Sequence, residues 1–269
     1  MTDSGAARAT VTPSPWRHRG RRFHRWLRIG FVIWGVTSTL WLFNSMRTQG
    51  VDASTLQSDG RVTVFDDPSA LEFAPVDSNG RPGLIFFCGA GVAATAYAPL
   101  VRPIADTGHR VVIVKLPYRL APLPAHAAEA LSRARRAIGH HADTTRWVVA
   151  GHSFGAVLAA RMARTDPEKL SSLVLIGTTH PKEENMSALP LPVIKVYGAN
   201  DGVAPAEAVL ANAPLLPPQT KWVRIDGGNH SQFAHYGHQL FDGAATIPRE
   251  QQQALTRAEL LGALESAIR

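Results

Sequence analysis

The sequence is poor in the side chains that cross-link proteins or hold metal ions. Its 269 residues include one cysteine, Cys88, so a disulfide within the chain is excluded. Cys88 lies between aromatic residues and a glycine, a setting that favours a small buried side chain over a reactive thiol. His230, His235 and His238 lie close together, but no second cluster of Cys, Asp or His has ligand spacing. We therefore predict neither a disulfide nor a metal centre.

Acidic residues are scarce at the start of the chain, and the net charge is concentrated there. The chain has 28 Lys and Arg residues and 21 Asp and Glu residues, and its pI is about 10.1. Such a basic composition is typical of nucleic-acid binders. Residues 1–28, however, hold seven Arg and one acid, Asp3, so six of the seven net positive charges lie in this tail. The rest of the chain is nearly neutral. We predict a disordered basic tail over residues 1–28 and no nucleic-acid binding.

Charge is missing altogether from the next segment. Residues 29–43 carry no ionisable side chain, and with their flanks they reach the lower length limit of a membrane-spanning helix. Trp26 and Trp41 lie near its ends, as interfacial aromatic residues do. We predict a single-pass signal anchor over residues 29–46, with the arginine-rich side cytoplasmic and the rest of the chain periplasmic or extracellular. A cleaved signal peptide, with Val51-Asp52-Ala53 as a weak cleavage candidate, and an amphipathic or buried helix stay open.

After a polar segment over residues 47–60, which we predict to be a linker, strand-like and helix-like patterns alternate to the end of the chain. Strands are predicted at 61–65, 71–75, 84–87, 110–115, 146–150, 172–176, 192–197 and 221–225. Helices are predicted at 94–107, 124–138, 154–165, 204–211 and 249–267. This alternation predicts an α/β catalytic domain over residues 61–269, with a mostly parallel sheet and helices on both faces.

One short motif in this domain carries chemical information. Gly151-His152-Ser153-Phe154-Gly155 is a G-x-S-x-G pattern between a predicted buried strand and a predicted helix. A strand, a sharp turn bearing a serine and a helix form a nucleophile elbow. Because the turn is tight, Gly151 and Gly155 must lack bulk. We therefore predict that Ser153 is a nucleophile.

A serine hydroxyl is a weak nucleophile at neutral pH and needs a base, which in turn needs an orienting acid. With an elbow of this kind, the order along the chain is Ser, then Asp or Glu, then His. Asp201 follows the strand predicted at 192–197, and His230 follows the strand predicted at 221–225. Since the carboxyl ends of parallel strands share one edge of a sheet, we expect both side chains at the edge that carries Ser153.

Three other carboxylates compete for the role of the acid. Asp226 is four residues before His230, at the end of the same strand. Glu183 and Glu184 come after an earlier strand, but they do not follow it directly. Asp201 is therefore favoured.

These motifs resemble those of the α/β-hydrolase superfamily, and within it the small bacterial members related to dienelactone hydrolases. Within about residues 80–266 the matching pieces are Phe86-Phe87-Cys88-Gly89-Ala90-Gly91, Gly151-His152-Ser153-Phe154-Gly155, Gly198-Ala199-Asn200-Asp201 and Gly228-Asn229-His230-Ser231-Gln232-Phe233. The resemblance implies an eight-stranded, mostly parallel sheet and an enzyme that needs no cofactor. Dienelactone hydrolases have a cysteine nucleophile, whereas this chain has a serine, so their particular chemistry is not expected.

The resemblance also implies an oxyanion hole, in which two preorganised donors bind the charge of a tetrahedral intermediate. One donor would be the backbone N–H of Phe154. The other would come from the loop after the strand at 84–87, with the N–H of Ala90 as first candidate and that of Gly91 as second. Few residues separate the strand predicted at 172–176 from the next one, too few for a helical cap domain. An open site with a minimal cap is therefore expected.

Together these features predict a membrane-anchored serine hydrolase that acts on a carboxylic ester or a related acyl compound. Ser153 would attack the carbonyl carbon, His230 would transfer the proton, and Asp201 would orient the imidazole. An acyltransferase with the same triad and a catalytically silent binding protein stay open, because the triad does not select among them. The expected partners are a small acyl substrate and the membrane, and the sequence predicts no oligomeric state.

Overall fold

The computed structural model describes residues 15–78 and 80–268, with side chains from residue 23 onward, so residues 1–14 of the predicted tail lie outside the described residues. The strands are β1 (Val62–Asp66), β2 (Ala70–Pro75), β3 (Gly83–Phe87), β4 (Val111–Val114), β5 (Trp147–His152), β6 (Leu170–Ile176), β7 (Val193–Gly198) and β8 (Lys221–Ile225). The α-helices are α1 (Pro15–Ser45), α2 (Ala98–Ala105), α3 (Pro124–His140), α4 (Phe154–Thr165), α5 (Ala206–Ala211) and α6 (Arg249–Ser266). The 3-10 helices are η1 (Ala53–Leu56), η2 (Ala94–Tyr97), η3 (Pro117–Arg119), η4 (Pro167–Lys169), η5 (Ala213–Leu215) and η6 (Ser231–Phe233).

The strands form one 8-stranded sheet in the order β1-β2-β4-β3-β5-β6-β7-β8. The β1–β2 and β2–β4 pairs are antiparallel, and every pair from β4 to β8 is parallel. In the centre of the sheet, Leu84 of β3 lies in register with Val111 of β4 and Val148 of β5. The predicted α/β class and the mostly parallel sheet are confirmed. Each strand and helix predicted for the domain is present, β8 and α4 with the predicted ends and the others with shifted ends.

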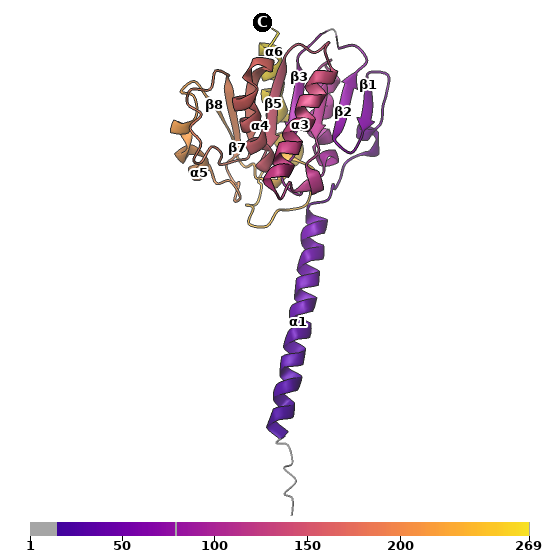
Figure 1. Cartoon of the computed structure of the whole chain (residues 1–269), viewed down its shortest axis with the longest axis vertical. Coiled ribbons are helices and arrows are strands. Elements are labelled where there is room, and N and C mark those ends of the chain that lie inside the picture. Colours follow the sequence, from indigo (N-terminus) through magenta and orange to yellow (C-terminus); the bar gives the residue numbers. More distant parts are fainter. Residues whose placement is uncertain (1–14, 79, 269) are drawn as a thin grey trace, which may run out of the picture. The chain divides into compact units, whose positions relative to one another are not determined.

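The central strands are apolar along their whole length because helices cover both faces of the sheet. Every residue of β3, β4 and β5 is buried. Helices α3 and α4 pack on one face, and α2 and α6 pack on the other (Figure 1). Burial on both sides also explains why these strands form continuous apolar runs in the sequence and do not alternate.

The loops that follow β3 to β8 lie along one edge of the sheet, which we call the carboxyl edge. Because these strands are parallel, the residues directly after them are brought together there even when they are far apart in sequence. Ala90 follows β3, Ser153 follows β5, Asp201 follows β7 and His230 follows β8. The fold therefore gathers the predicted site residues at a single edge.

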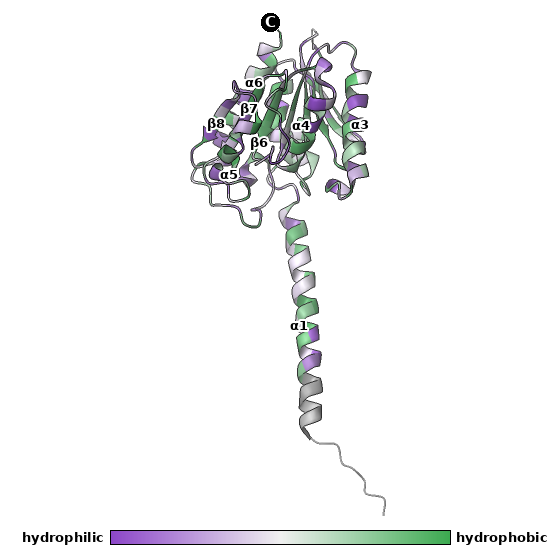
Figure 2. Ribbon diagram, turned by 60° about the vertical axis from the view of Figure 1, so that its left-hand side comes forward, coloured by the Kyte–Doolittle hydropathy of each residue, from purple (hydrophilic) through white to green (hydrophobic). Residues whose placement is uncertain are grey.

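The long N-terminal helix forms a unit of its own, since the chain divides into residues Met1–Asn44 and Ser45–Arg269. Its segment Phe23–Ser45 has a mean hydropathy of 1.3, is exposed to solvent and is long enough to cross a membrane, although a signal sequence would have the same properties. Figure 2 shows this apolar stretch of α1. The helix begins at Pro15, so the disorder predicted for residues 15–28 is wrong. Proline is preorganised for a first helical position, and arginine favours helix, so the apolar helix extends into the basic tail.

The predicted linker, residues 47–60, is packed onto the domain. Arg102 of α2 donates Nη1 to the carbonyl oxygens of Thr55 at 3.1 Å and Gln57 at 2.9 Å. Its Nη2 donates to the carboxylate of Asp59 at 2.8 Å. Only 7% of Arg102 is exposed, so these hydrogen bonds satisfy a charge that is largely removed from water. The polar composition of residues 47–60 does not indicate that they pack on the domain, because the residue that binds them, Arg102, lies on a helix far along the chain.

Candidate active site

The serine of the G-x-S-x-G motif occupies a strained turn between a strand and a helix. β5 ends at His152, Ser153 has φ 54° and ψ −119°, and α4 begins at Phe154. A positive φ is costly for a residue with a side chain and persists only where the surrounding structure holds it. Here the N–H of Ser153 donates to the carbonyl of Ile176 on β6 at 2.9 Å. The local geometry is that of a nucleophile elbow.

The two motif glycines permit this turn because neither position has room for a side chain. A Cβ on Gly151 would lie 2.2 Å from the carbonyl oxygen of Gly155. A Cβ on Gly155 would lie 2.2 Å from the carbonyl oxygen of Phe87 and 2.4 Å from that of Cys88. The start of α4 is therefore in direct backbone contact with the end of β3, where the predicted oxyanion loop begins.

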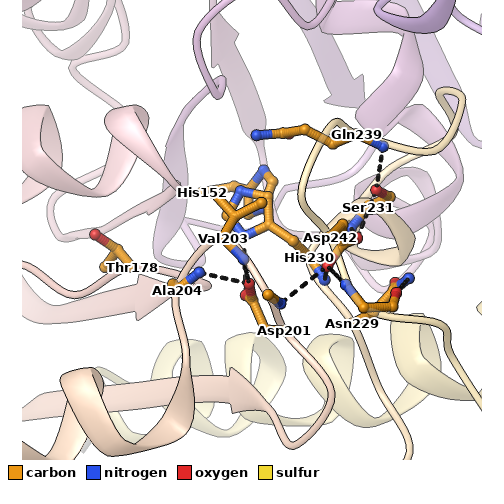
Figure 3. Close-up of polar contacts among 12 residues, drawn as sticks. His152, Thr178, Asp201, Val203, Ala204, Asn229, His230, Ser231, Gln239 and Asp242 are labelled. Carbon is orange, nitrogen blue, oxygen red and sulfur yellow. Dashed lines mark hydrogen bonds and ion pairs between the residues drawn. The ribbon is translucent and has the colours of Figure 1, made fainter.

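Asp201 and His230 form a buried, hydrogen-bonded pair. His230 Nδ1 and Asp201 Oδ2 are 2.8 Å apart, and Asp201 is 3% and His230 1% exposed. The other carboxylate oxygen of Asp201 accepts the N–H groups of Val203 at 2.9 Å and Ala204 at 2.6 Å (Figure 3). Because a carboxylate accepts, Nδ1 must carry the proton, and the lone pair of the neutral imidazole then lies on Nε2.

The Nε2 atom of His230 is buried and has no hydrogen-bond partner in the part of the chain that the structure describes. His230 and Ser153 line the same cavity, whose volume is about 410 Å³. No hydrogen bond joins the Ser153 hydroxyl to this nitrogen among the described residues, and such bonds often tighten only when substrate is bound. The arrangement leaves a basic nitrogen beside a cavity that also contains the serine.

Among the described residues, none of the rival carboxylates forms a hydrogen bond with His230. Asp226 pairs with Arg224 at 2.9 Å, and its side chain is 85% exposed. Glu184 pairs with Arg164 on α4, and Glu183 and Glu184 line the cavity without a hydrogen bond to His230. Of the four candidate acids, Asp201 is the one that the structure brings to the imidazole.

The two candidate amides in the loop after β3, those of Ala90 and Gly91, differ in their hydrogen bonds. The N–H of Gly89 donates to the Tyr97 hydroxyl at 2.9 Å, and the N–H of Gly91 donates to the carbonyl of Arg119 at 2.7 Å. The second candidate from the sequence, Gly91, is therefore already engaged. The N–H of Ala90 makes no hydrogen bond to another described residue, and Ala90 is half-buried.

The other predicted donor is the N–H of Phe154. As the first residue of α4, Phe154 has an N–H with no acceptor inside its own helix. The positive end of the helix dipole lies at the same place and favours negative charge. Phe154 also lines the cavity that contains Ser153.

A buried hydrogen-bond network, which no sequence pattern indicated, holds the loop after β3 that is predicted to form the oxyanion hole. The Tyr97 hydroxyl accepts from Gly89 and lies 2.9 Å from Nδ1 of His152, so it donates to that nitrogen. Burial raises the pKa of Tyr97 well above its ordinary value and keeps the hydroxyl protonated. Burial, together with the nearby charge that His230 would carry, lowers the pKa of His152 well below its ordinary value. The elbow histidine is therefore a neutral hydrogen-bond acceptor.

A second residue that the sequence did not identify, Asp242, organises the loop of His230. Its Oδ1 accepts the N–H of His230 at 3.0 Å, and its Oδ2 accepts the N–H of Ser231 at 2.8 Å (Figure 3). Oδ1 also accepts the N–H of Gly202 at 3.3 Å, which links the loop of His230 to the loop of Asp201. Asp242 lies in a long irregular segment, so no periodic pattern marks it.

Two buried titratable groups lie next to the cavity. Lys195 on β7 is fully buried, and its Nζ donates to the carbonyl oxygen of His180. Burial lowers the pKa of Lys195 to about 7, and burial lowers the pKa of His180, which lines the cavity, to about 4. Burial therefore disfavours the charged forms of both groups.

Cys88 is buried beside the oxyanion loop, and burial raises the pKa of its thiol to about 12. The thiol is protonated at neutral pH and is a structural side chain. Among the described residues, His, Cys, Asp and Glu form no group of three that could hold a metal ion.

The sequence model of the alpha/beta hydrolase family matches residues 83–254, which is more than half of the chain. No curated protein matches the sequence significantly. The matched range contains every predicted site residue from Ala90 to His230, so the family assignment and the site concern the same part of the molecule.

Solved structures with the same fold include hydrolases of several kinds. A predicted CIB-like hydrolase from Thermoplasma acidophilum has a TM-score of 0.58 at 14% identity, covering 74% of this chain and 98% of its own. A ferulic acid esterase from Streptomyces cinnamoneus has a TM-score of 0.57 at 19% identity, covering 72% and 68%. A bacterial membrane phospholipase A has a TM-score of 0.55 at 13% identity, covering 90% and 99%. At these identities the similarity shows a shared fold.

Proposed function

The chain belongs to the α/β-hydrolase family, and from this premise we propose that it is a membrane-anchored serine hydrolase acting on a carboxylic ester or a related acyl compound. Ser153 is the nucleophile, His230 is the general base and acid, and Asp201 orients the imidazole. The backbone N–H groups of Phe154 and Ala90 form the oxyanion hole.

The reaction follows from the geometry of these groups. Nε2 of His230 takes the hydroxyl proton as Ser153 attacks the carbonyl carbon, and the imidazolium is stabilised by the carboxylate of Asp201. The tetrahedral oxyanion accepts hydrogen bonds from Phe154 and Ala90. His230 then protonates the leaving alcohol, and water, activated by the same nitrogen, hydrolyses the acyl-enzyme.

One observation carries this proposal. Asp201 and His230 form a buried pair at 2.8 Å, and the free Nε2 of the pair lies beside the cavity that holds the serine of a strained elbow. A binding protein of this fold would have no need of a buried Asp–His pair beside the cavity that holds the serine of a strained turn, so the pair favours catalysis.

The cavity supports a small acyl group or the exposed end of a larger substrate. Its walls combine apolar side chains of Val157, Val203 and Ala204 with the hydroxyls of Thr178 and Thr179. The segment between β6 and β7 contains no helix, so no cap domain covers the cavity. Relatives of the fold act on ester bonds, in the esterase and the phospholipase named above, which supports an ester for this chain.

A fluorophosphonate probe tests the proposal directly on the full-length protein in detergent. We expect rapid covalent labelling of the wild type and none of Ser153→Ala, with Ser231→Ala labelled only at Ser153. Labelling that persists in Ser153→Ala, or its absence from a folded wild type, would contradict the proposal.

We further propose that α1 is a signal anchor with the N-terminus in the cytoplasm and the catalytic domain on the far side of the membrane. The excess of arginine on the N-terminal side of the apolar segment supports this orientation. An alkaline phosphatase fused after Arg269 should be active, whereas a cytoplasmic reporter at the same position should be silent. The reverse pattern would overturn the orientation.

A further inference from the structure

The chain enters the domain at the carboxyl edge, beside the oxyanion loop. The carbonyl of Ser45 accepts the N–H of Gly237 at 2.7 Å, in the segment that follows His230. Arg119 donates to the carbonyl of Met46 at 2.9 Å. The side chain of Met46 lies against the oxyanion loop, 3.5 Å from where a Cβ on Gly91 would be. The first residues of the domain are thus fixed at the edge that carries the candidate site.

This attachment limits how far the edge can lie from the bilayer. The candidate span ends at Ser45, and Phe43, still exposed and apolar, is only two residues before it. Two residues of extended chain cover at most about 7 Å, whatever direction the helix takes. If α1 crosses a membrane, the part of the carboxyl edge around Ser45 and Met46 must therefore lie near the membrane surface.

The same edge presents apolar side chains to solvent. After β4, Tyr118 is 78% and Leu123 56% exposed, and in the loop after His230, Phe241 is 82% exposed. Tyr118 has φ 54° and Phe241 has φ 68°, conformations that cost free energy for residues with large side chains. Strain that turns aromatic side chains outward calls for a function at that surface.

We propose that the carboxyl edge rests on the membrane interface through Tyr118, Leu123 and Phe241, and that the enzyme takes its acyl ester from a lipid of the same bilayer. This inference rests on the proposed function for its substrate, while the contact itself does not. Aromatic side chains favour the interface, and the exposed Arg47, next to the attachment point, can pair with lipid phosphate. The cavity of Ser153 lies among the loops of this edge, so a lipid ester at the interface is on the side of the domain that carries the cavity.

Fluorescence quenching tests the contact without relying on catalysis. The full-length protein, reconstituted in phosphatidylcholine–phosphatidylglycerol vesicles, would carry an environment-sensitive dye at Leu123→Cys or, as control, at Ile268→Cys. The two positions have nearly equal exposure, 56% and 57%, but Ile268 follows α6 at the opposite edge of the sheet. The native thiol of Cys88 is buried and does not compete for the dye.

We expect nitroxide-labelled lipids to quench the dye at position 123 at least threefold more than the dye at position 268. Equal quenching at the two positions would overturn the proposed contact. Protection of position 123 that depends on protein concentration and is insensitive to the nitroxide lipid would also overturn it, because a second copy of this chain would then cover the edge.

An activity ratio tests the substrate source. The edge variant is the double substitution Leu123→Asp/Phe241→Asn. Aspartate at position 123 can cap the N-terminus of α3, which has no side-chain cap in the native chain. Asparagine at position 241 tolerates the positive φ found there. We expect hydrolysis of bilayer phospholipid to fall at least tenfold and that of soluble p-nitrophenyl butyrate to change less than twofold. The matched variant Val76→Asn/Ile268→Asp should change neither rate.

An equal effect of the edge variant on both esters would overturn the lipid source. A wild type that cleaves only the soluble ester would overturn it too, while leaving the proposed hydrolase intact. A wild type that cleaves neither ester and is not labelled at Ser153 would overturn the proposed function and the lipid source together, and the quenching result would still decide the contact.

Discussion

The two halves of the candidate site are built by different means. The serine half is held by the backbone, since Gly151 and Gly155 leave no room for side chains and the elbow is locked against β3 and β6. The acid–base half is held by side chains from distant segments. Asp242 binds the backbone of His230, and Gln252 of α6 binds the backbone of Asn229 beside it. A rigid backbone places the nucleophile, and a polar network places the base.

The largest expected effect is in the acid–base half. Asp201→Asn retains the shape of the side chain but offers Nδ1 of His230 a group that stabilises neither the required tautomer nor the imidazolium. We expect kcat to fall by about 10⁴-fold, measured with a soluble ester. Asp226→Asn is the control and should change kcat less than twofold, because Asp226 is exposed and pairs only with Arg224. Near-normal activity of Asp201→Asn would remove Asp201 from the triad.

The serine half of the site should lose activity when a side chain is added where the backbone is closely packed. Gly155→Ala places a Cβ where the carbonyl of Phe87 now lies, 2.2 Å away, so the elbow must shift. A displacement of about 1 Å costs about 10²-fold in rate, and overpacking costs about 1–3 kcal/mol of unfolding free energy. Fluorophosphonate labelling rates and denaturant unfolding would measure the two effects.

The control for that variant is Gly262→Ala in α6, where nothing lies within 4 Å of the new Cβ. It should raise the unfolding free energy by about 0.5–1 kcal/mol, the usual gain for alanine over glycine inside a helix. If Gly155→Ala behaved like Gly262→Ala, backbone contact would not be what holds the serine half.

The polar network should tolerate change better. Asp242→Asn keeps one acceptor oxygen and loses the other, so His230 is held less firmly while the elbow is untouched. We expect kcat to fall by about 10- to 100-fold with KM nearly unchanged, since the substrate cavity does not include Asp242. Loss comparable to that of Asp201→Asn would mean that Asp242 acts on the reaction more directly than through the loop.

The smallest effect concerns stability and lies outside both halves. Burial lowers the pKa of Lys195 from 10.5 to about 7, so between these values the unfolded chain binds a proton that the folded chain has lost. The unfolding free energy should therefore rise with pH over this range. Lys195→Met should raise it by about 1–2 kcal/mol at pH 7 and abolish the rise, as measured by urea unfolding from pH 7 to 9. A variant that is less stable at pH 7, or that keeps the slope, would contradict this account.

The contrast between the halves also explains what the sequence could predict. The elbow is a local motif, so five consecutive residues between a strand and a helix were enough to indicate Ser153 and its glycines. The strand order put Asp201 and His230 at the same edge, because parallel strands end together. The helices followed from apolar periodicity, and the central strands followed from continuous apolar runs, since burial on both faces makes these strands apolar throughout.

The residues that the sequence missed act across long separations. Tyr97 and His152 are 55 positions apart, and Arg102 reaches Thr55 across 47, so no pattern of spacing marks either contact. Lys195 interrupts a buried strand and gives no sign of its partner, a backbone carbonyl. Asp242 lies in an irregular loop. Each depends on tertiary structure that composition and periodicity do not encode.

The missing side chain at Gly155 has a consequence for the energetics of turnover. It lets the carbonyl groups of Phe87 and Cys88 abut the first turn of α4, so the segments that carry Phe154 and Ala90 are in direct backbone contact. Backbone contact then sets the distance between the two proposed oxyanion donors. The free energy needed to position the donors of the oxyanion hole is therefore part of the folding free energy, and the donors need not be repositioned in each catalytic cycle.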